Sequence, residues 1–154
     1  MSSIFAVIGD LNTIINGLRV PAGNLAISRS QMPQIDDQEK FKKTLMKKGV
    51  GHFTNAVKVT ELRLTQSEVD KWKVFKMMRT LRSKGLKSFP KIVVSSDNYV
   101  IDGSHRYVAR LNLSDRSNVE VLKVDMKALD LIEHINANWA DYGLKRRNYS
   151  GRTA

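Results

Sequence analysis

The segment VIDGSHRYVARLNL, at residues 100–113, constrains the fold more than any other part of the chain. It has the pattern of a buried strand that runs without a linker into an apolar helix, with Gly-Ser-His-Arg at the joint. Gly103 lets the backbone turn sharply and approach a ligand closely, because it has no side chain. A strand joined so tightly to a helix predicts a sheet with helices packed on it.

Hydrophobic periodicity predicts the elements around this corner. The helices have apolar positions three and four residues apart and are expected at 4–18, 37–48, 66–84 and 126–138. The strands have alternating or continuous apolar residues and are expected from residue 56 and at 91–95, 99–101 and 118–124. The helix at 66–84 is expected to start there because Thr65 and Glu68 form a capping-box pattern.

These elements predict an α/β (α+β) fold, in which a small mixed sheet is flanked by helices. We expect a helical N-terminal extension at 1–55, the α/β domain at 56–140 and a basic tail at 141–154. The apolar stripe of the first helix suits either packing on the core or contact with a second copy, so a homodimer through this helix is one expectation.

The charge of the chain favours a polyanionic partner, DNA or RNA. Twenty-six Lys and Arg residues against fifteen Asp and Glu give a formal charge of +11, and each phosphate that a cation neutralises releases a counterion. The absence of cysteine excludes disulfides and thiolate chemistry. The N-terminal residues suit neither a secretory signal nor a membrane span, so we expect a cytoplasmic protein with no membrane partner.

One run of the sequence concentrates this charge. Between residues 71 and 91 the cations have no acidic residue among them; the predicted nucleic-acid contacts there are Lys71, Trp72, Lys73, Lys76, Arg79, Arg82, Lys84 and Lys87. A solvated helix face usually mixes signs, so this run predicts a polyanion-binding surface. Trp72 suits stacking on a base or packing under the N-terminal helix, and packing is the slightly favoured alternative.

The corner itself combines groups that bind phosphate. The start of a helix presents unpaired N–H groups and a positive dipole end. Arg106 adds a planar fork that suits phosphate, His105 a donor or proton relay, and Ser104 a hydroxyl. An ordinary Asp-Gly turn with surface side chains is the alternative.

The motif IDGSHRYVA, which follows a strand and precedes a helix, resembles the signature corner of the ParB/sulfiredoxin superfamily. Members carry Gly-Glu-Arg-Arg in partition proteins, Gly-Cys-His-Arg in sulfiredoxin and Asp-Gly-His-His-Arg-Trp in the archaeal ADP-dependent serine kinase. VKVTELRLTQSEV and FPKIVVSSDNYVIDG follow the order of the family's other elements, so the resemblance covers about residues 56–125. The phrase SRSQMPQI also resembles phage-encoded ParB-like nucleases, which implies a phage source and the cytoplasm of its host.

The resemblance implies a nucleoside triphosphate or diphosphate with Mg²⁺ at the corner. The implied phosphate-binding residues are Asp102, Gly103, Ser104, His105 and Arg106, together with Thr65 and Gln66 in the turn before the long helix. Ser104 stands where sulfiredoxin has its reactive cysteine, which excludes that chemistry. Gln66 stands about where the kinase has its catalytic Glu, and glutamine cannot accept a proton; Glu68 or Asp70 is the expected substitute.

Two hypotheses of function follow. In the first, the corner performs phosphate chemistry, either DNA cleavage, hydrolysis of a nucleoside triphosphate or phosphotransfer, with His105, Arg106 and Glu68 as catalytic residues. A metal would need carboxylates to converge, and Asp97, Asp102 and Glu68 are the weak candidates; His52 and His134 are expected to be structural or surface residues. In the second, the chain is a non-catalytic DNA- or protein-binding module that retains the fold.

Overall fold

The computed structural model describes residues 4–146, and the side chains of residues 10–144. Its centre is a five-stranded mixed sheet with the order β2-β6-β4-β5-β3. The strands are β2 (His52–Lys58), β3 (Arg63–Leu64), β4 (Ile92–Val94), β5 (Tyr99–Asp102) and β6 (Asn118–Val124). β2 pairs with β6 and β4 with β5 in antiparallel fashion, whereas β4 with β6 and β3 with β5 are parallel pairs.

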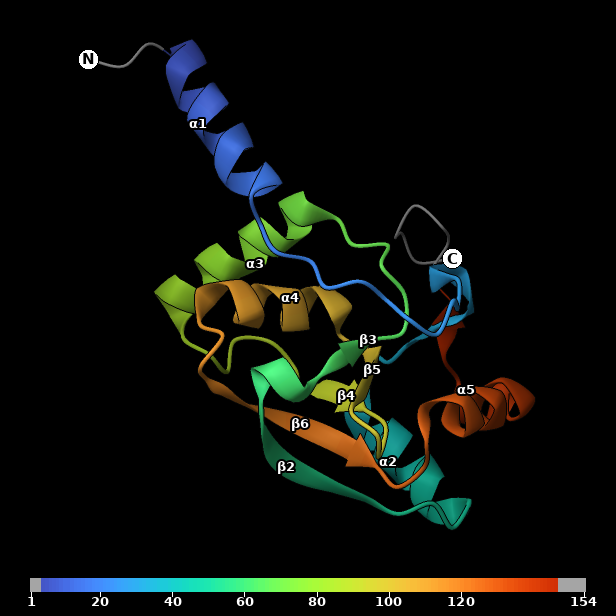
Figure 1. Cartoon of the computed structure of the whole chain (residues 1–154). Helices are drawn as coiled ribbons and strands as arrows, with labels where there is room; N and C mark the ends of the chain where they lie inside the picture. Colours follow the sequence, from blue (N-terminus) through green and yellow to red (C-terminus); the bar gives the residue numbers. More distant parts are fainter. Residues whose placement is uncertain (1–3, 147–154) are drawn as a thin grey trace.

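Helices cover both faces of this sheet (Figure 1). On one face lie α3 (Lys71–Lys84) and α4 (Ser104–Leu113), and their apolar residues form one core with Val94, Val100 and Val121. On the other lie α2 (Gln38–Lys47), α5 (Ala128–Ala137) and α6 (Trp139–Tyr142), which form a second core with neighbouring strand residues. The sequence prediction of an α/β fold with a small mixed sheet between helices is therefore confirmed.

The two cores explain why the first three residues of β5, Tyr99 to Ile101, are all hydrophobic. Successive side chains of a strand point to opposite faces, so Val100 enters the core under α4 while Tyr99 and Ile101 enter the core under α5. All four residues of β5 are buried as a result. The strand therefore delivers Asp102 into the interior of the protein, where the chain turns into α4.

The predicted start of the long helix is wrong. α3 begins at Lys71, and its N-cap is Asp70, whose carboxylate accepts hydrogen bonds from the backbone N–H groups of Trp72 and Lys73 at 3.0 and 3.3 Å. Thr65 is fully buried, and its hydroxyl lies 3.4 Å from the carbonyl oxygen of Val100. Its side chain is therefore used between elements and does not cap the helix. Residues 66–70 form a non-helical segment between β3 and α3.

The N-terminal third is joined to the sheet more closely than its sequence indicates. The boundary expected after residue 55 falls inside β2, and α2 places Phe41 and Leu45 in the second core. Within 19–36, the 3₁₀ helix η1 (Arg29–Gln31) precedes β1 (Pro33–Gln34), which pairs with β7 (Lys145–Arg146); a further 3₁₀ helix, η2 (Val59–Glu61), follows β2. The expected basic tail lies outside the described residues from residue 147 onward.

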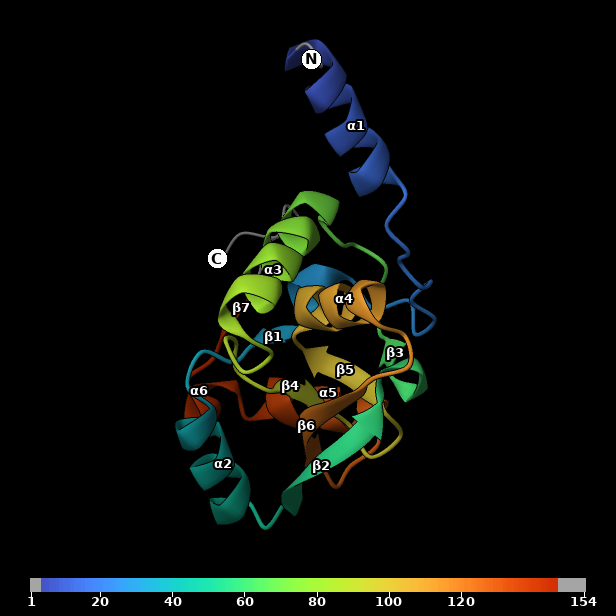
Figure 2. The same ribbon diagram turned by 90° about the vertical axis from the view of Figure 1, so that its left-hand side faces the viewer.

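The first helix, α1 (Ile4–Asn16), extends away from the body of the protein in both views (Figures 1 and 2). Ile15 is buried, and Lys71 Nζ donates to the carbonyl oxygen of Asn16 at 3.0 Å, whereas Ile14 is 53% exposed. Contact with the body is thus made at the end of the helix. In the described part of the chain, no helix has the length and apolar character needed to cross a bilayer.

The raised pKa of Tyr142 predicts that the protein loses stability at alkaline pH. The side chain of Tyr142 is buried, and the centroid of its ring lies 5.4 Å from that of Phe41. Burial, together with the nearby Asp141 carboxylate, raises the pKa of Tyr142 to about 12. The unfolded pKa is about 10, so the stabilising contribution of the neutral phenol is complete below pH 10 and is lost as the pH rises through about 12. The midpoint of thermal unfolding should fall more steeply over this range in the wild type than in Tyr142→Phe. Parallel curves would contradict the assignment.

Candidate phosphate corner and nucleic-acid interface

The corner between β5 and α4 depends on Gly103. Its φ of +104° is a left-handed conformation that favours glycine. A Cβ placed there would lie 2.7 Å from Nη2 of Arg106, because the guanidinium folds back over the glycine. Gly103 is thus required both for the turn and for the position of Arg106.

Arg106 and Asp102 form an ion pair at this corner. Nη2 of Arg106 lies 3.4 Å from Oδ2 of Asp102, which is almost fully buried and also accepts a hydrogen bond from the backbone N–H of Ile35 at 3.3 Å. The same Nη2 lies 3.4 Å from the carbonyl oxygen of Lys91. Among the described residues, Arg106 Nε is a buried donor with no hydrogen-bond partner. A buried donor without a partner is costly, so Arg106 is the candidate here for an anionic ligand.

His105 points about 100° around α4 from Arg106 and is held by contacts within the fold. It is 2% exposed, and its Nε2 accepts a hydrogen bond from the backbone N–H of Asp70 at 3.0 Å. The terminal nitrogens of Arg29 lie 3.5 and 3.4 Å from the two ring nitrogens. The imidazole therefore joins α4 to the start of α3, and a proton relay by His105 would require the ring to leave these contacts.

Arg29 is the residue of this site that sequence reasoning missed. It is buried in η1, and its Nη1 donates to the carbonyl oxygen of Glu68 at 3.1 Å while its backbone N–H faces Glu68 Oε1 at 3.4 Å. The side chain thus connects η1, the segment before α3 and His105. Arg29 belongs to SRSQMPQI, a segment already noted for its resemblance to phage-encoded ParB-like nucleases, but nothing in the residue spacing of this segment predicts that the Arg29 side chain is buried.

The segment 66–70 is held from two sides. Gln66 is buried, and its Oε1 accepts a hydrogen bond from the backbone N–H of Glu68 at 2.5 Å. Gly23 passes so close that a Cβ on it would lie 2.3 Å from the carbonyl carbon of Gln66. Asp70 therefore contacts His105 directly through its backbone N–H, and Glu68 is linked to His105 through Arg29, while the Glu68 side chain is exposed.

The carboxylates that the sequence offered as weak metal candidates do not form a cluster among the described residues. In the described part of the chain, no group of three His, Cys, Asp or Glu residues is arranged to hold a metal ion. Asp97 instead accepts hydrogen bonds from Ser95 Oγ at 2.5 Å and from the backbone N–H of Ala128 at 3.0 Å, and so fixes the turn against α5. His134 pairs with Tyr142 at 2.7 Å, as expected for a structural histidine, and His52 is partly buried.

The predicted nucleic-acid residues lie along α3 and the loop after it. Lys76, Arg79, Arg82, Lys84 and Lys87 are exposed, while Lys71, Lys73 and Ser104 of the corner are partly buried. The four ion pairs found among the described residues do not involve Lys76, Arg79, Arg82 or Lys84. Trp72 is 49% exposed, so the favoured alternative, burial of Trp72 under the first helix, is wrong.

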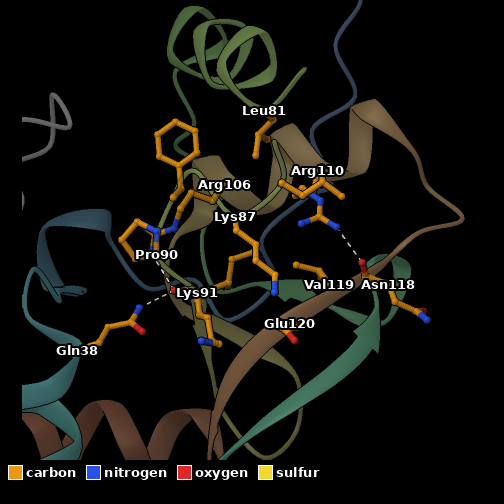
Figure 3. Close-up of a pocket in the computed structure, with 13 residues that line it drawn as sticks. Gln38, Leu81, Lys87, Pro90, Lys91, Arg106, Arg110, Asn118, Val119 and Glu120 are labelled. Carbon is orange, nitrogen blue, oxygen red and sulfur yellow. Dashed lines mark hydrogen bonds between the residues drawn. The ribbon is translucent and has the colours of Figure 1, made fainter. Parts of the chain in front are cut away.

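A cavity of about 430 Å³ lies between α4, the end of α3 and the start of β6 (Figure 3). Its charged lining residues are Lys87, Lys91, Arg106, Arg110 and Glu120. Arg110 Nη2 donates to the carbonyl oxygen of Asn118 at 2.8 Å, and burial lowers the pKa of Arg110, although a guanidinium stays charged at neutral pH. Arg106 and Arg110 are four residues apart and so lie on one face of α4, but the sequence analysis did not single out Arg110, and only the fold brings Lys87 and Lys91 to that face.

This arrangement defines a mixed α/β domain with a buried strand-to-helix corner and a basic helix beside it. No family model and no curated protein matches the chain. It is similar to two solved structures of the pNOB8-like ParB N-domain. One, in its C222₁ form, has 18% identity and a TM-score of 0.43 over 61% of this chain and 37% of that chain. The other has 17% identity and a TM-score of 0.45 over 61% and 34%.

The chain thus spans about a third of the length of those solved chains. Both similarities are to ParB N-domains, and the resemblance of the corner to phage-type nucleases and to the serine kinase stays a prediction.

Gly103→Ala tests the corner. We expect it to lower the free energy of unfolding by about 1–3 kcal/mol through backbone strain, and further through the contact with Arg106. Gly49→Ala is the matched control, because Gly49 has a φ of +73° but a Cβ there would meet nothing within 4 Å. Urea unfolding of both variants measures the difference. An equal loss of unfolding free energy in the two variants would show that the Arg106 side chain moves away from the new Cβ without an energetic cost.

Proposed function

We propose that this protein binds nucleic acid through the exposed cations of α3 and the loop that follows it. The observation that carries the proposal is the one-signed face formed by Lys76, Arg79, Arg82 and Lys84, which are exposed and take part in none of the described ion pairs. Cations without local carboxylate partners attract a phosphate backbone and gain from counterion release. The half-exposed Trp72 on the same helix suits stacking on an unpaired base.

The apolar side of α3 supports this use of the helix. Val74 and Leu81 are buried in the first core, and Met77 and Met78 pack against it. The helix is therefore held rigidly on the sheet while its cations face outward. Electrostatic contacts of this kind give affinity without sequence readout, so we propose binding with little sequence preference.

The double variant Lys76→Gln/Arg79→Gln tests the proposal. We expect about tenfold weaker DNA binding by fluorescence anisotropy. A plot of log K against log salt should also become shallower, by up to about 0.9 for each duplex phosphate that the variant no longer neutralises.

Lys43→Gln/Lys47→Gln removes the same charge from α2, on the opposite face of the sheet (Figure 1), and both of these lysines are exposed. It should change the affinity little. Equal losses in the two double variants would mean that net charge alone drives binding, and would refute a specific face.

Phosphate chemistry at the corner is the second candidate function, and the unpartnered Nε of Arg106 is the observation that favours it. That donor suits a phosphate of a nucleoside triphosphate or diphosphate. The described carboxylates provide no cluster for Mg²⁺, and His105 is already bonded to Asp70. These contacts support a binding role for the corner more than a catalytic one.

Incubation with Mg²⁺, γ-labelled ATP and DNA separates the two roles. From the buried position of His105 we expect ATP and DNA to stay intact while DNA binds. Label transfer, phosphate release or DNA shortening that stops in Arg106→Ala would instead assign the chemistry to this corner.

A homodimer through α1 is part of the proposal. Support comes from neighbouring residues of its last turn, since Ile15 is buried against the body while Ile14 is 53% exposed. An apolar side chain left in water on a projecting helix gains by packing against a second copy.

A further inference from the structure

We propose that the free edge of β2 pairs with β2 of a second copy of this chain, so that two sheets join into one across a two-fold axis. This contact is separate from the one proposed for α1. Three features of the strand support it: its unpaired backbone groups, its lack of the usual protection of a sheet edge, and the order of residues along it.

β2 is the longer of the two edge strands of the sheet. The order β2-β6-β4-β5-β3 leaves β2 and β3 with one neighbour each, and β3 has two residues whereas β2 has seven. β2 lies at the outside of the sheet in both views (Figures 1 and 2). Four of its residues are exposed: Phe53, Thr54, Ala56 and Lys58. A long exposed edge is a template for pairing with another strand.

The hydrogen bonds to β6 show which backbone groups of β2 are free. The carbonyl oxygen of Gly51 accepts a hydrogen bond from the N–H of Asp125 at 2.8 Å. At the other end, the N–H of Val59 donates to the carbonyl oxygen of Ser117 at 3.0 Å. Residues of an antiparallel ladder alternate in direction, so the odd-numbered residues between these positions direct their N–H and C=O groups to β6. The even-numbered residues of 52–58 therefore direct theirs away from the sheet, where no other described strand lies.

β2 lacks the features that normally prevent an edge from pairing. Natural edge strands carry proline, a bulge, several charges or a covering loop. The seven residues of β2 contain no proline and one formal charge, on Lys58 at the end of the strand. They form seven successive pairs with β6 without a register shift. Phe53 is 50% exposed on this strand, so a second strand beside it would remove apolar surface from water.

The residues of β2 are complementary to themselves when Asn55 lies on the two-fold axis. The cross-strand pairs, each made twice, are then Phe53 with Val57, Thr54 with Ala56, and His52 with Lys58. The even-numbered pairs are the hydrogen-bonded ones, so the outward groups make about eight hydrogen bonds, within the roughly 5–15 of a typical protein interface. Each Phe53 gains an apolar neighbour, and the two lysines do not face each other. A charged foreign strand would find one cation along this edge, whereas β2 itself matches every position.

The pairing also has a consequence for nucleic-acid binding, which rests on the function proposed for α3. A two-fold axis through an antiparallel strand pair runs perpendicular to the sheet, so α3 of both copies lies on the same side of the joined sheet. Two basic surfaces on one side can contact one nucleic acid together, and linked contacts bind more tightly than single ones.

Disulfide trapping tests the register directly, because the chain has no cysteine of its own. Two Asn55→Cys side chains would face each other in a non-hydrogen-bonded pair, whose Cα atoms lie about 4.5 Å apart, within the range of a disulfide. Phe53→Cys is the matched control: position 53 is more exposed than position 55, but its two copies would lie four positions apart along the strands, about 13 Å. Both variants are made in an Ile14→Asp protein, which removes the contact proposed for α1.

We expect oxidation to cross-link Asn55→Cys into a dimer and to leave Phe53→Cys monomeric on a non-reducing gel. Equal cross-linking of the two variants would indicate random collision and would overturn the pairing. Absence of a cross-linked Asn55→Cys dimer would overturn it as well.

Analytical ultracentrifugation measures the strength of the contact in the same Ile14→Asp background. Thr54→Pro removes an outward N–H but no bond to β6, so we expect it to weaken the dimer at least about tenfold, with circular dichroism to confirm folding. Thr54→Val keeps this N–H and should leave the dimer intact. Equal dimerisation of folded Thr54→Pro and Thr54→Val, or an Ile14→Asp protein that is monomeric throughout, would contradict the proposal.

Salt separates this contact from nucleic-acid binding. Each copy has a formal charge of +11, so added salt should tighten the dimer by screening the repulsion between copies while it weakens DNA binding. A dimer that dissociates as salt is added would overturn the backbone pairing. DNA binding that Lys76→Gln/Arg79→Gln leaves unchanged would refute the function proposed for α3 and leave the β2 contact standing.

Discussion

The buried carboxylate of Asp102 holds the N-terminal segment, β5 and α4 together. It ends β5 inside the core, accepts a hydrogen bond from the backbone N–H of Ile35 and pairs with Arg106. A buried charge is tolerated only when it is paired and hydrogen-bonded. Asp102 therefore fixes the N-terminal segment and the first turn of α4 to the same strand end, and Gly103 supplies the backbone conformation that makes this geometry accessible.

From this corner α4 separates two environments. His105 faces the start of α3, where Arg29 and the N–H of Asp70 surround it, whereas Arg106 faces the cavity with Lys87, Lys91 and Arg110. Consecutive residues on a helix point about 100° apart, so one tight turn serves both sides. The first environment is a closed network that stabilises the junction of helices, and the second retains a buried donor and open volume. The buried donor that would suit an anion is therefore on the Arg106 side.

The basic face and the cavity depend on the same packing. The core under α3 and α4 orients both helices, and the loop that follows α3 lines the cavity. An electrostatic surface gives affinity for phosphates in general, whereas a lined cavity can distinguish one chemical unit from another.

The sequence by itself determined the mixed α/β class, the strand-to-helix corner and the basic run, because each is a local pattern of hydrophobic period, glycine or charge. Only the tertiary structure decided the start of α3, where burial of Thr65 overrode a capping-box pattern and Asp70 capped the helix instead. It also decided the inward turn of Arg29, the separate uses of Asp97 and Asp102, and the exposure of Trp72. The cavity needed the fold as well, because Lys87 and Arg110 are distant in sequence and meet only when the loop before β4 packs beside α4. Local patterns report what a segment prefers, but contacts between distant segments decide which side chains are buried, paired or left for a ligand.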